Sequence, residues 1–67
     1  MPLIHVTLVR GRGEEEIAAL GRAVTTAVHE ALGTPREAIR VTVSECEPEH
    51  YFVGGETMAE LRSSGRR

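Results

Sequence analysis

The sequence contains no lysine, one cysteine and two aromatic residues, and each shortage excludes a class of protein. The single cysteine, Cys46, excludes an intramolecular disulfide, and the spacing of cysteine and histidine shows no zinc pattern. All eight basic residues are arginine and the formal net charge is −2, so the basic excess of a nucleic-acid-binding protein is absent. We therefore predict neither a metal site nor a nucleic-acid partner.

Long hydrophobic runs are also missing. No apolar segment approaches the length of a membrane span. The amino-terminal residues lack the basic and apolar regions of a signal peptide. The sequence therefore predicts no membrane partner, and a cytoplasmic location is the default expectation.

The small size and the scarcity of aromatic side chains limit the hydrophobic core. A chain of 67 residues buries only about 60% of its unfolded surface. A core of this size rarely supplies more than roughly 3–5 kcal/mol without disulfides, metals or partner chains. Because disulfides and a zinc pattern are absent, we expect the chain to be stabilised by forming an oligomer.

The first two thirds of the chain have the pattern of a strand, a helix and a second strand. Residues 3–9 are apolar at nearly every position, which is typical of a strand buried on both faces. Residues 14–32 carry one apolar stripe at helical spacing, and Gly33 is a good helix stop. Apolar and polar residues then alternate over 39–44, as in a strand. The helical stripe consists of Ile17, Leu20, Val24, Val28, Ala31 and Leu32.

This order predicts an α/β fold made of one βαβ unit with parallel strands and a right-handed crossover. Thr34, Pro35 and Glu37 predict a short second helical start with Thr34 as its cap. Two strands and one helix leave a sheet face and its edges open, so other copies of the chain must complete the fold.

The remaining residues are less regular. Residues 51–55 predict a short hairpin or edge strand, whereas the pattern of 56–62 is ambiguous. Residues 63–67 are rich in serine, glycine and arginine, which is typical of a frayed tail. We expect residues 1–67 to form a single domain.

Pro2 stands out because the residue after an initiator methionine becomes the amino terminus when the methionine is removed. A proline at the terminus is a secondary amine, which is a base and a nucleophile. An internal proline nitrogen is an inert amide, so retention of Met1 would abolish this chemistry. Taken alone, Pro2 could also simply open an edge strand. Arg12 and Arg40 alone would be ordinary surface arginines of a loop and a half-exposed strand.

Taken together, these positions resemble the 4-oxalocrotonate tautomerase family over nearly the whole chain. The shared features are the length, the Met-Pro start, Gly11-Arg12 after the first strand, Pro35 and Arg40, and the aromatic-x-x-Gly-Gly segment that starts at Tyr51. The resemblance implies a hexamer, a trimer of dimers, that transfers protons without a cofactor. It further implies that Pro2 is the base and that Arg12 and Arg40 bind substrate.

The same resemblance places Tyr51 where the family has an active-site phenylalanine, and Arg62 where it often has an arginine of minor effect. Two positions depart from the family pattern. Tyr51 adds a hydroxyl to a wall that is normally apolar, and Phe52 replaces a usual glycine. Both departures bear on the identity of the substrate more than on the mechanism.

The implied reaction is a 1,3-allylic keto–enol shift, which requires one base with a pKa near the operating pH. An ordinary α-amino group has a pKa of about 7.7–8.0. An apolar pocket and nearby arginines are expected to lower the pKa of the Pro2 amine. The resemblance implies that Arg12 binds the distal carboxylate of the substrate and that Arg40 stabilises the charge on its 2-oxygen. It also implies that these arginines come from neighbouring subunits. Tyr51 would cover the apolar middle of the substrate.

We therefore predict a tautomerase that acts on a small anionic 2-hydroxy or 2-oxo acid such as 2-hydroxymuconate, in aromatic degradation or in biosynthesis. One alternative is a hydratase or dehalogenase of a haloacrylate-like acid, with Glu47 or Glu49 near the site. Another is an oligomeric binding protein without catalytic activity.

Overall fold

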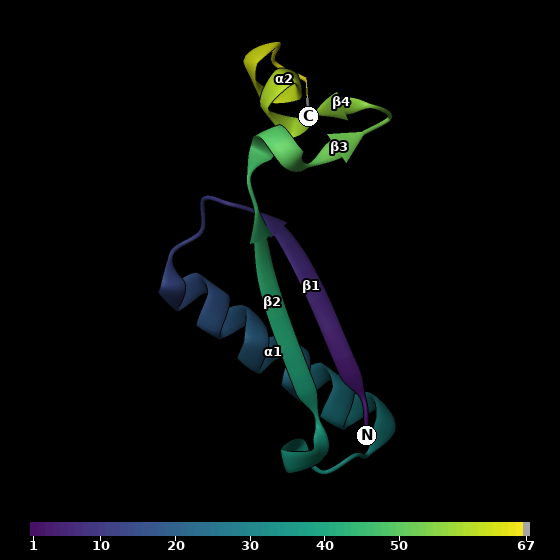
Figure 1. Ribbon diagram of the computed structural model, residues 1–67. Coiled ribbons are helices and arrows are strands. Elements are labelled where there is room, and N and C mark those ends of the chain that lie inside the picture. Colours follow the sequence, from purple (N-terminus) through teal and green to yellow (C-terminus); the bar gives the residue numbers. More distant parts are fainter. Residues whose placement is uncertain (67) are drawn as a thin grey trace.

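The computed structural model describes residues 1–66 and confirms the predicted βαβ unit (Figure 1). Strand β1 spans Leu3–Val9, helix α1 spans Glu14–Leu32 and strand β2 spans Arg40–Cys46. The two strands are parallel, and their register runs from Leu3 opposite Arg40 to Val9 opposite Cys46. The helix has the predicted bounds, whereas β2 begins one residue after the start of the predicted alternation and continues two residues beyond its end.

Helix α1 begins and ends where the sequence chemistry predicts. The Glu16 carboxylate accepts a hydrogen bond from the backbone N–H of Gly13 at 3.2 Å, and three glutamates fill the first turn. Carboxylates at this end are favoured by the helix dipole. At the other end Gly33 has φ of 69°, a left-handed conformation that glycine adopts without strain, and its N–H donates to the carbonyl of His29 at 2.9 Å.

The turn after α1 differs from the prediction. Thr34 does not cap the short 3₁₀ turn η1 (Arg36–Ala38), which instead begins after Pro35 without a side-chain cap. The Thr34 carbonyl accepts a hydrogen bond from the ring Nδ1 of half-buried His29 at 2.7 Å. This ring therefore ties the end of α1 to the turn that leads into β2.

Helix α1 covers one face of the two-stranded sheet and leaves the other face open (Figure 1). Along β1, the half-buried residues Ile4, Val6 and Leu8 alternate with exposed ones. Leu3 remains 68% exposed. The predicted burial of both strand faces is therefore not achieved within a single chain, because no second layer covers the open face.

The segment after β2 projects beyond the carboxyl end of the sheet (Figure 1). We call residues 47–66 the C-terminal arm and residues 3–46 the body. The arm contains the 3₁₀ turn η2 (Pro48–His50), strands β3 (Phe52–Val53) and β4 (Glu56–Thr57), and helix α2 (Met58–Ser63). The predicted hairpin is confirmed: β3 and β4 are antiparallel, and Gly54 and Gly55 connect them at φ of 60° and 90°. This two-residue turn requires positive φ at both positions.

The ambiguous region 56–62 completes the hairpin and forms most of α2. The Thr57 hydroxyl accepts from the N–H of Glu60 at 3.0 Å, and the Glu60 carboxylate accepts from the N–H of Thr57 at 2.8 Å. These reciprocal bonds form a capping box that starts the helix. Beyond α2, Arg66 pairs with Glu56 through two contacts of 3.1 and 2.5 Å. The predicted fraying of residues 63–67 stays a prediction, and Arg67 lies outside the described residues.

The single chain is elongated and poorly buried. Its radius of gyration is 14.9 Å, whereas a compact domain of this length has about 11 Å. Its accessible surface is 4834 Å², compared with roughly 4,200 Å² for a compact chain of this mass. Within residues 1–66, only Ile39 and Leu61 form the buried core. This geometry supports the expectation that further chains complete the fold.

Candidate functional site

Pro2 and Arg40 lie together at one end of the sheet. The backbone N–H of Arg40 donates to the carbonyl of Pro2 at 3.0 Å. This contact follows from the parallel register, because Leu3 is directly opposite Arg40. The Arg40 guanidinium in turn donates to the carbonyl of Glu37 at 2.7 Å. The βαβ unit therefore holds an arginine beside the first residues of the chain.

Arg12 lies at the opposite end, in the loop that follows β1. It lines a pocket of about 320 Å³ together with Arg10 and Arg62. Arg12 also approaches Glu16 at 3.9 Å, but both side chains are more than 60% exposed, and such a surface ion pair contributes little. Arg12 is therefore available to a ligand, and helix α2 brings Arg62 to the same pocket.

Tyr51 also belongs to this distal end, between η2 and β3. It is half-buried, and its carbonyl accepts a hydrogen bond from the N–H of Met58 at 2.7 Å. This bond fixes the backbone of Tyr51 to the first residue of α2. The position of the tyrosine is thus set by the internal geometry of the arm.

The two ends cannot meet within one chain. The seven-residue strand β1 separates them by roughly 20–25 Å at about 3.3 Å per residue. The structure therefore brings Pro2 and Arg40 together and keeps Arg12 and Tyr51 apart from them. A site that contains all four residues requires the distal end of another chain.

Arg10 is a charged residue of the distal pocket that the sequence analysis did not single out. Its guanidinium bonds the Glu47 carboxylate and lies 3.7 Å from the Glu45 carboxylate. The hydrogen bond that Arg10 donates to Glu47 raises the pKa of Arg10 most, followed by the negative charges of Glu47 and Glu45. The parallel register offered the signal, since it places residues that follow β1 beside residues that follow β2. Because Glu47 is bonded to Arg10, it gives no support to the hydratase alternative.

His5 lies away from both ends of the sheet, in the middle of β1. On the open sheet face, the His5 ring lies 2.7 Å from the Thr42 hydroxyl and 3.2 Å from the Thr7 hydroxyl.

Within residues 1–66, no group of three His, Cys, Asp or Glu side chains is arranged to hold a metal ion. Nor does any helix in that range combine the length and apolarity needed to cross a membrane.

The chain is similar to known proteins over most of its length. A family model described as tautomerase enzyme matches residues 2–61. A probable tautomerase of Bacillus cereus is 42% identical over 60 residues, which is 90% of this chain and 98% of the relative.

Solved structures are similar as well. TomN, described as a 4-oxalocrotonate tautomerase homologue in the tomaymycin biosynthetic pathway, is 59% identical with a TM-score of 0.92, covering 96% of this chain and 98% of TomN. A heterohexamer 4-oxalocrotonate tautomerase from Chloroflexus aurantiacus has a chain that is 40% identical with a TM-score of 0.86, covering 92% of this chain and all of that one.

Proposed function

Because the chain belongs to the tautomerase family, we propose that it is a cofactor-independent isomerase that ketonises a small 2-hydroxydienoate, with Pro2 as the base. The observation that carries this proposal is the placement of Pro2 beside Arg40 at the amino end of the sheet. Removal of Met1 converts the Pro2 nitrogen into a secondary amine on the rigid end of β1. The base then lies at the same end of the sheet as Arg40, whose positive charge favours anionic substrates.

The reaction moves one proton and leaves the composition of the substrate unchanged. The Pro2 nitrogen accepts the proton of the 2-hydroxyl group, the 2-oxygen becomes a carbonyl, and Pro2 returns the proton to a conjugated carbon. Negative charge builds on the 2-oxygen in the transition state, and Arg40 is the cation that stabilises it. One base is sufficient because it both removes and returns the proton.

The distal end of another chain supplies the remaining groups. Arg12 binds the far carboxylate of the substrate through charge-assisted hydrogen bonds, and Tyr51 covers its apolar middle. The exposed Arg12 guanidinium and the elongated shape of the single chain both support this division. We propose a homohexamer, in which the site is incomplete without neighbouring chains. The predicted cytoplasmic location remains part of this proposal.

A biosynthetic substrate is favoured over an aromatic degradation product by one observation. The chain is 59% identical to TomN, which is described as belonging to the tomaymycin biosynthetic pathway. The hydroxyl of Tyr51 would also alter a pocket shaped for 2-hydroxymuconate, and Phe52 adds bulk to the hairpin that follows Tyr51. We therefore expect measurable but reduced activity with 2-hydroxymuconate and higher activity with a 2-hydroxydienoate of different shape.

The test is the pH profile of kcat/KM for ketonisation of 2-hydroxymuconate, with protein shown by intact mass to begin at Pro2. Activity should rise through a single near-neutral pKa, because the free amine is the active form. A parallel assay with 3-chloroacrylate separates the hydratase or dehalogenase alternative. Release of chloride without any ketonisation would refute the tautomerase proposal, and the absence of both activities would favour a binding protein.

The assembly is tested by size-exclusion chromatography with light scattering. A homohexamer has about six times the 7.3 kDa mass of the chain. A monomer at the concentrations used for the assay would contradict a site shared between chains.

A further inference from the structure

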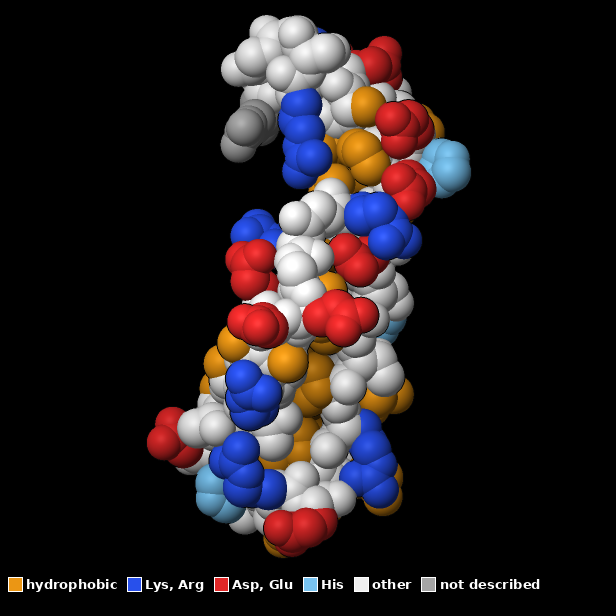
Figure 2. Space-filling view, turned by 90° about the vertical axis from the view of Figure 1, so that its left-hand side faces the viewer, with side chains coloured by type: hydrophobic (Ala, Val, Ile, Leu, Met, Phe, Trp, Pro, Cys, Tyr) orange, Lys and Arg blue, Asp and Glu red, His pale blue; other side chains and the backbone are white. Residues whose placement is uncertain are grey.

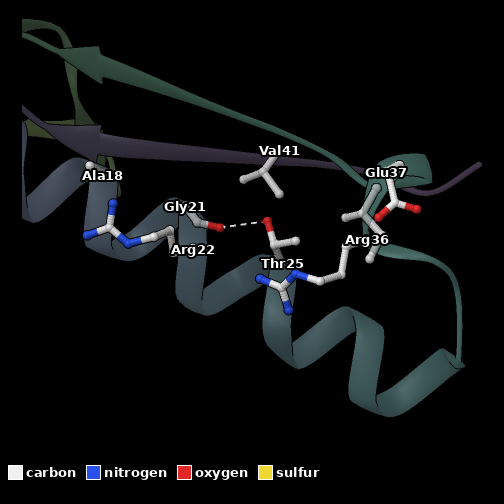
Figure 3. Close-up of a pocket in the computed structure, with 8 residues that line it drawn as sticks. Ala18, Gly21, Arg22, Thr25, Arg36, Glu37 and Val41 are labelled. Atoms are coloured by element: carbon white, nitrogen blue, oxygen red, sulfur yellow. Dashed lines mark hydrogen bonds between the residues drawn. The ribbon is translucent and has the colours of Figure 1, made fainter.

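An open groove runs between α1 and the outer edge of β2, next to the end of the sheet that holds Pro2 and Arg40 (Figure 3). Its volume is about 630 Å³. Ala18 and Gly21 from α1 and Ile39 and Val41 from the strand side give it an apolar lining. The buried side chain of Ile39 directly precedes Arg40 in the sequence. The groove is therefore adjacent to the proposed site but separate from it.

Gly21 is the unusual residue of this groove. Glycine in a helix interior costs about 1 kcal/mol relative to alanine, so a glycine here needs a packing reason. The chain itself offers none: apart from the adjacent residues and the nearby backbone of α1, no atom of the described residues lies within 4 Å of the position that a Cβ of Gly21 would take. The Gly21 carbonyl accepts a hydrogen bond from the Thr25 hydroxyl at 2.8 Å (Figure 3). The missing side chain thus makes room for something outside this chain.

The rim of the groove is mainly basic. Arg22 and Arg36 line it from α1 and η1, and Glu37 contributes one negative charge. The Arg36 guanidinium donates to the Thr26 hydroxyl at 3.1 Å. Neither arginine forms an ion pair within residues 1–66. In the space-filling view, basic side chains flank an apolar strip in the lower half of the molecule (Figure 2). The occupant of the groove should combine apolar groups with negative charge.

The C-terminal arm has this combination. Phe52 is 61% exposed and Val53 is 50% exposed, although both are large apolar residues. Glu49 is exposed three residues before Phe52 and has no ion-pair partner in the described part of the chain. The arm lies at the opposite end of the sheet from its own groove (Figure 1). It therefore cannot fill the groove of the chain to which it belongs.

We propose that the groove at Gly21 receives Phe52 and Val53 from the arm of a second copy, with Glu49 of that copy facing Arg22 and Arg36. This inference rests on the proposed assembly and names one of its surfaces. It covers exposed apolar groups on both partners and pairs unmatched charges. It also explains how Tyr51, the residue before Phe52, reaches the Pro2–Arg40 end of another chain.

The first test fills the groove with a side chain. Gly21→Leu improves helix propensity and meets no atom of its own chain at Cβ, so the monomer should fold at least as well. We expect the dissociation constant of the assembly, from sedimentation velocity across a dilution series, to rise at least tenfold. Ala19→Leu is the matched control, because Ala19 is exposed on α1 and does not line the groove. Circular dichroism verifies that the helix content of both variants is retained.

The second test changes the arm and the charges. Phe52→Arg should weaken assembly as Gly21→Leu does, since Phe52 is already exposed in its own chain. Glu49→Arg and Arg36→Glu should each weaken assembly, and the double variant should recover at least part of the loss. The proposal would be overturned if both Gly21→Leu and Phe52→Arg assembled with wild-type affinity. Citrate, a small polyanion, serves as a probe for a free anion site. Binding of citrate in the groove with assembly unchanged would also overturn the proposal. A monomeric wild type would refute the assembly itself, so the two failures are distinguishable.

Discussion

The body and the C-terminal arm achieve order in different ways. The body has long elements joined by regular backbone hydrogen bonds, yet Ile39 is its only core residue among those described. The arm has strands of two residues and a helix of six, which are too short to be stable by propensity. Specific polar contacts and the buried Leu61 side chain hold it together instead.

This difference separates two requirements of the proposed enzyme. The body supplies the base on a rigid strand but depends on other chains to cover its apolar faces. The arm keeps its shape while it projects from the sheet, so it can present Tyr51 and Arg62 to another chain. Changes near the start of β1 should therefore affect chemistry most, whereas changes that remove the internal contacts of the arm should mainly affect its local stability.

The largest effect is expected for Pro2→Ala. Replacing the secondary amine changes the base while leaving every other side chain in place, and a positioned base contributes roughly 10²–10⁴-fold to rate. We expect kcat to fall by this factor with little change in the mass of the assembly. Protein that retains Met1 is a matched control, because it keeps the proline ring but has an amide nitrogen. Equal activity of the cleaved and uncleaved forms would refute the role of the amine.

The next largest effect is expected for Leu61→Ala in the arm. Removing a buried leucine side chain costs about 2–5 kcal/mol, and the small arm should lie at the lower end of this range. Hydrogen exchange should accelerate over residues 52–63 and remain unchanged in β1. Leu32→Ala is the matched control, since Leu32 is 67% exposed. Uniform acceleration across both regions would show that the arm does not form a separate stabilising unit.

Arg12→Ala should weaken substrate binding more than chemistry. Loss of a charge-assisted hydrogen bond of about 1.5–3 kcal/mol should raise KM for 2-hydroxymuconate roughly tenfold to a hundredfold, with kcat changed only a few-fold. Arg10→Ala is the control within the same pocket, because the Arg10 guanidinium is engaged by Glu47 and Glu45. A larger effect at Arg10 than at Arg12 would reverse the assignment of the substrate arginine.

The sequence predicted the body better than the arm, and the reason is element length. A 19-residue helix contains five turns of apolar periodicity, so its bounds could be predicted. Helix α2 has too few residues for periodicity, although Thr57 and Glu60 have the capping-box spacing. The Arg66–Glu56 pair joins exposed residues ten positions apart, and no local pattern encodes such a contact.

The sequence likewise predicts one part of the candidate site better than the other. The hydrophobic pattern predicts the order of the two strands and their parallel direction, whereas the register that places Pro2 beside Arg40 comes from the structure. In the proposed assembly, bringing this pair together with Arg12 and Tyr51 depends on contacts between chains. No local pattern in one sequence encodes such contacts, since the open space at Gly21 and the exposure of Phe52 are visible only in the structure.

A smaller effect is expected when the cap of α2 is removed. Thr57→Ala eliminates the hydroxyl that accepts from the Glu60 N–H, and loss of such a cap costs about 1 kcal/mol. Thr57→Ser keeps the hydroxyl and should retain most of the stability. The change in stability is measured by chemical denaturation monitored through hydrogen exchange of residues 58–63. If both variants were equally destabilised, the methyl group and not the cap would be responsible.

The smallest effect is the pH dependence of the same cap. The backbone N–H of Thr57, and then its hydroxyl, lower the pKa of Glu60 below its ordinary value near 4.5, with a minor contribution from the charge of Arg66. The unfolded chain therefore binds the Glu60 proton at higher pH than the folded arm does. The stabilisation is complete above the ordinary pKa and is lost as the pH falls through the lowered folded value. Glu60→Gln should therefore flatten the decline in arm stability between about pH 6 and pH 3, whereas Glu30→Gln, which removes an exposed carboxylate of α1, should leave that decline unchanged. An identical pH dependence in the Glu60→Gln variant and the wild type would show that the capping box holds the arm without the charge of Glu60.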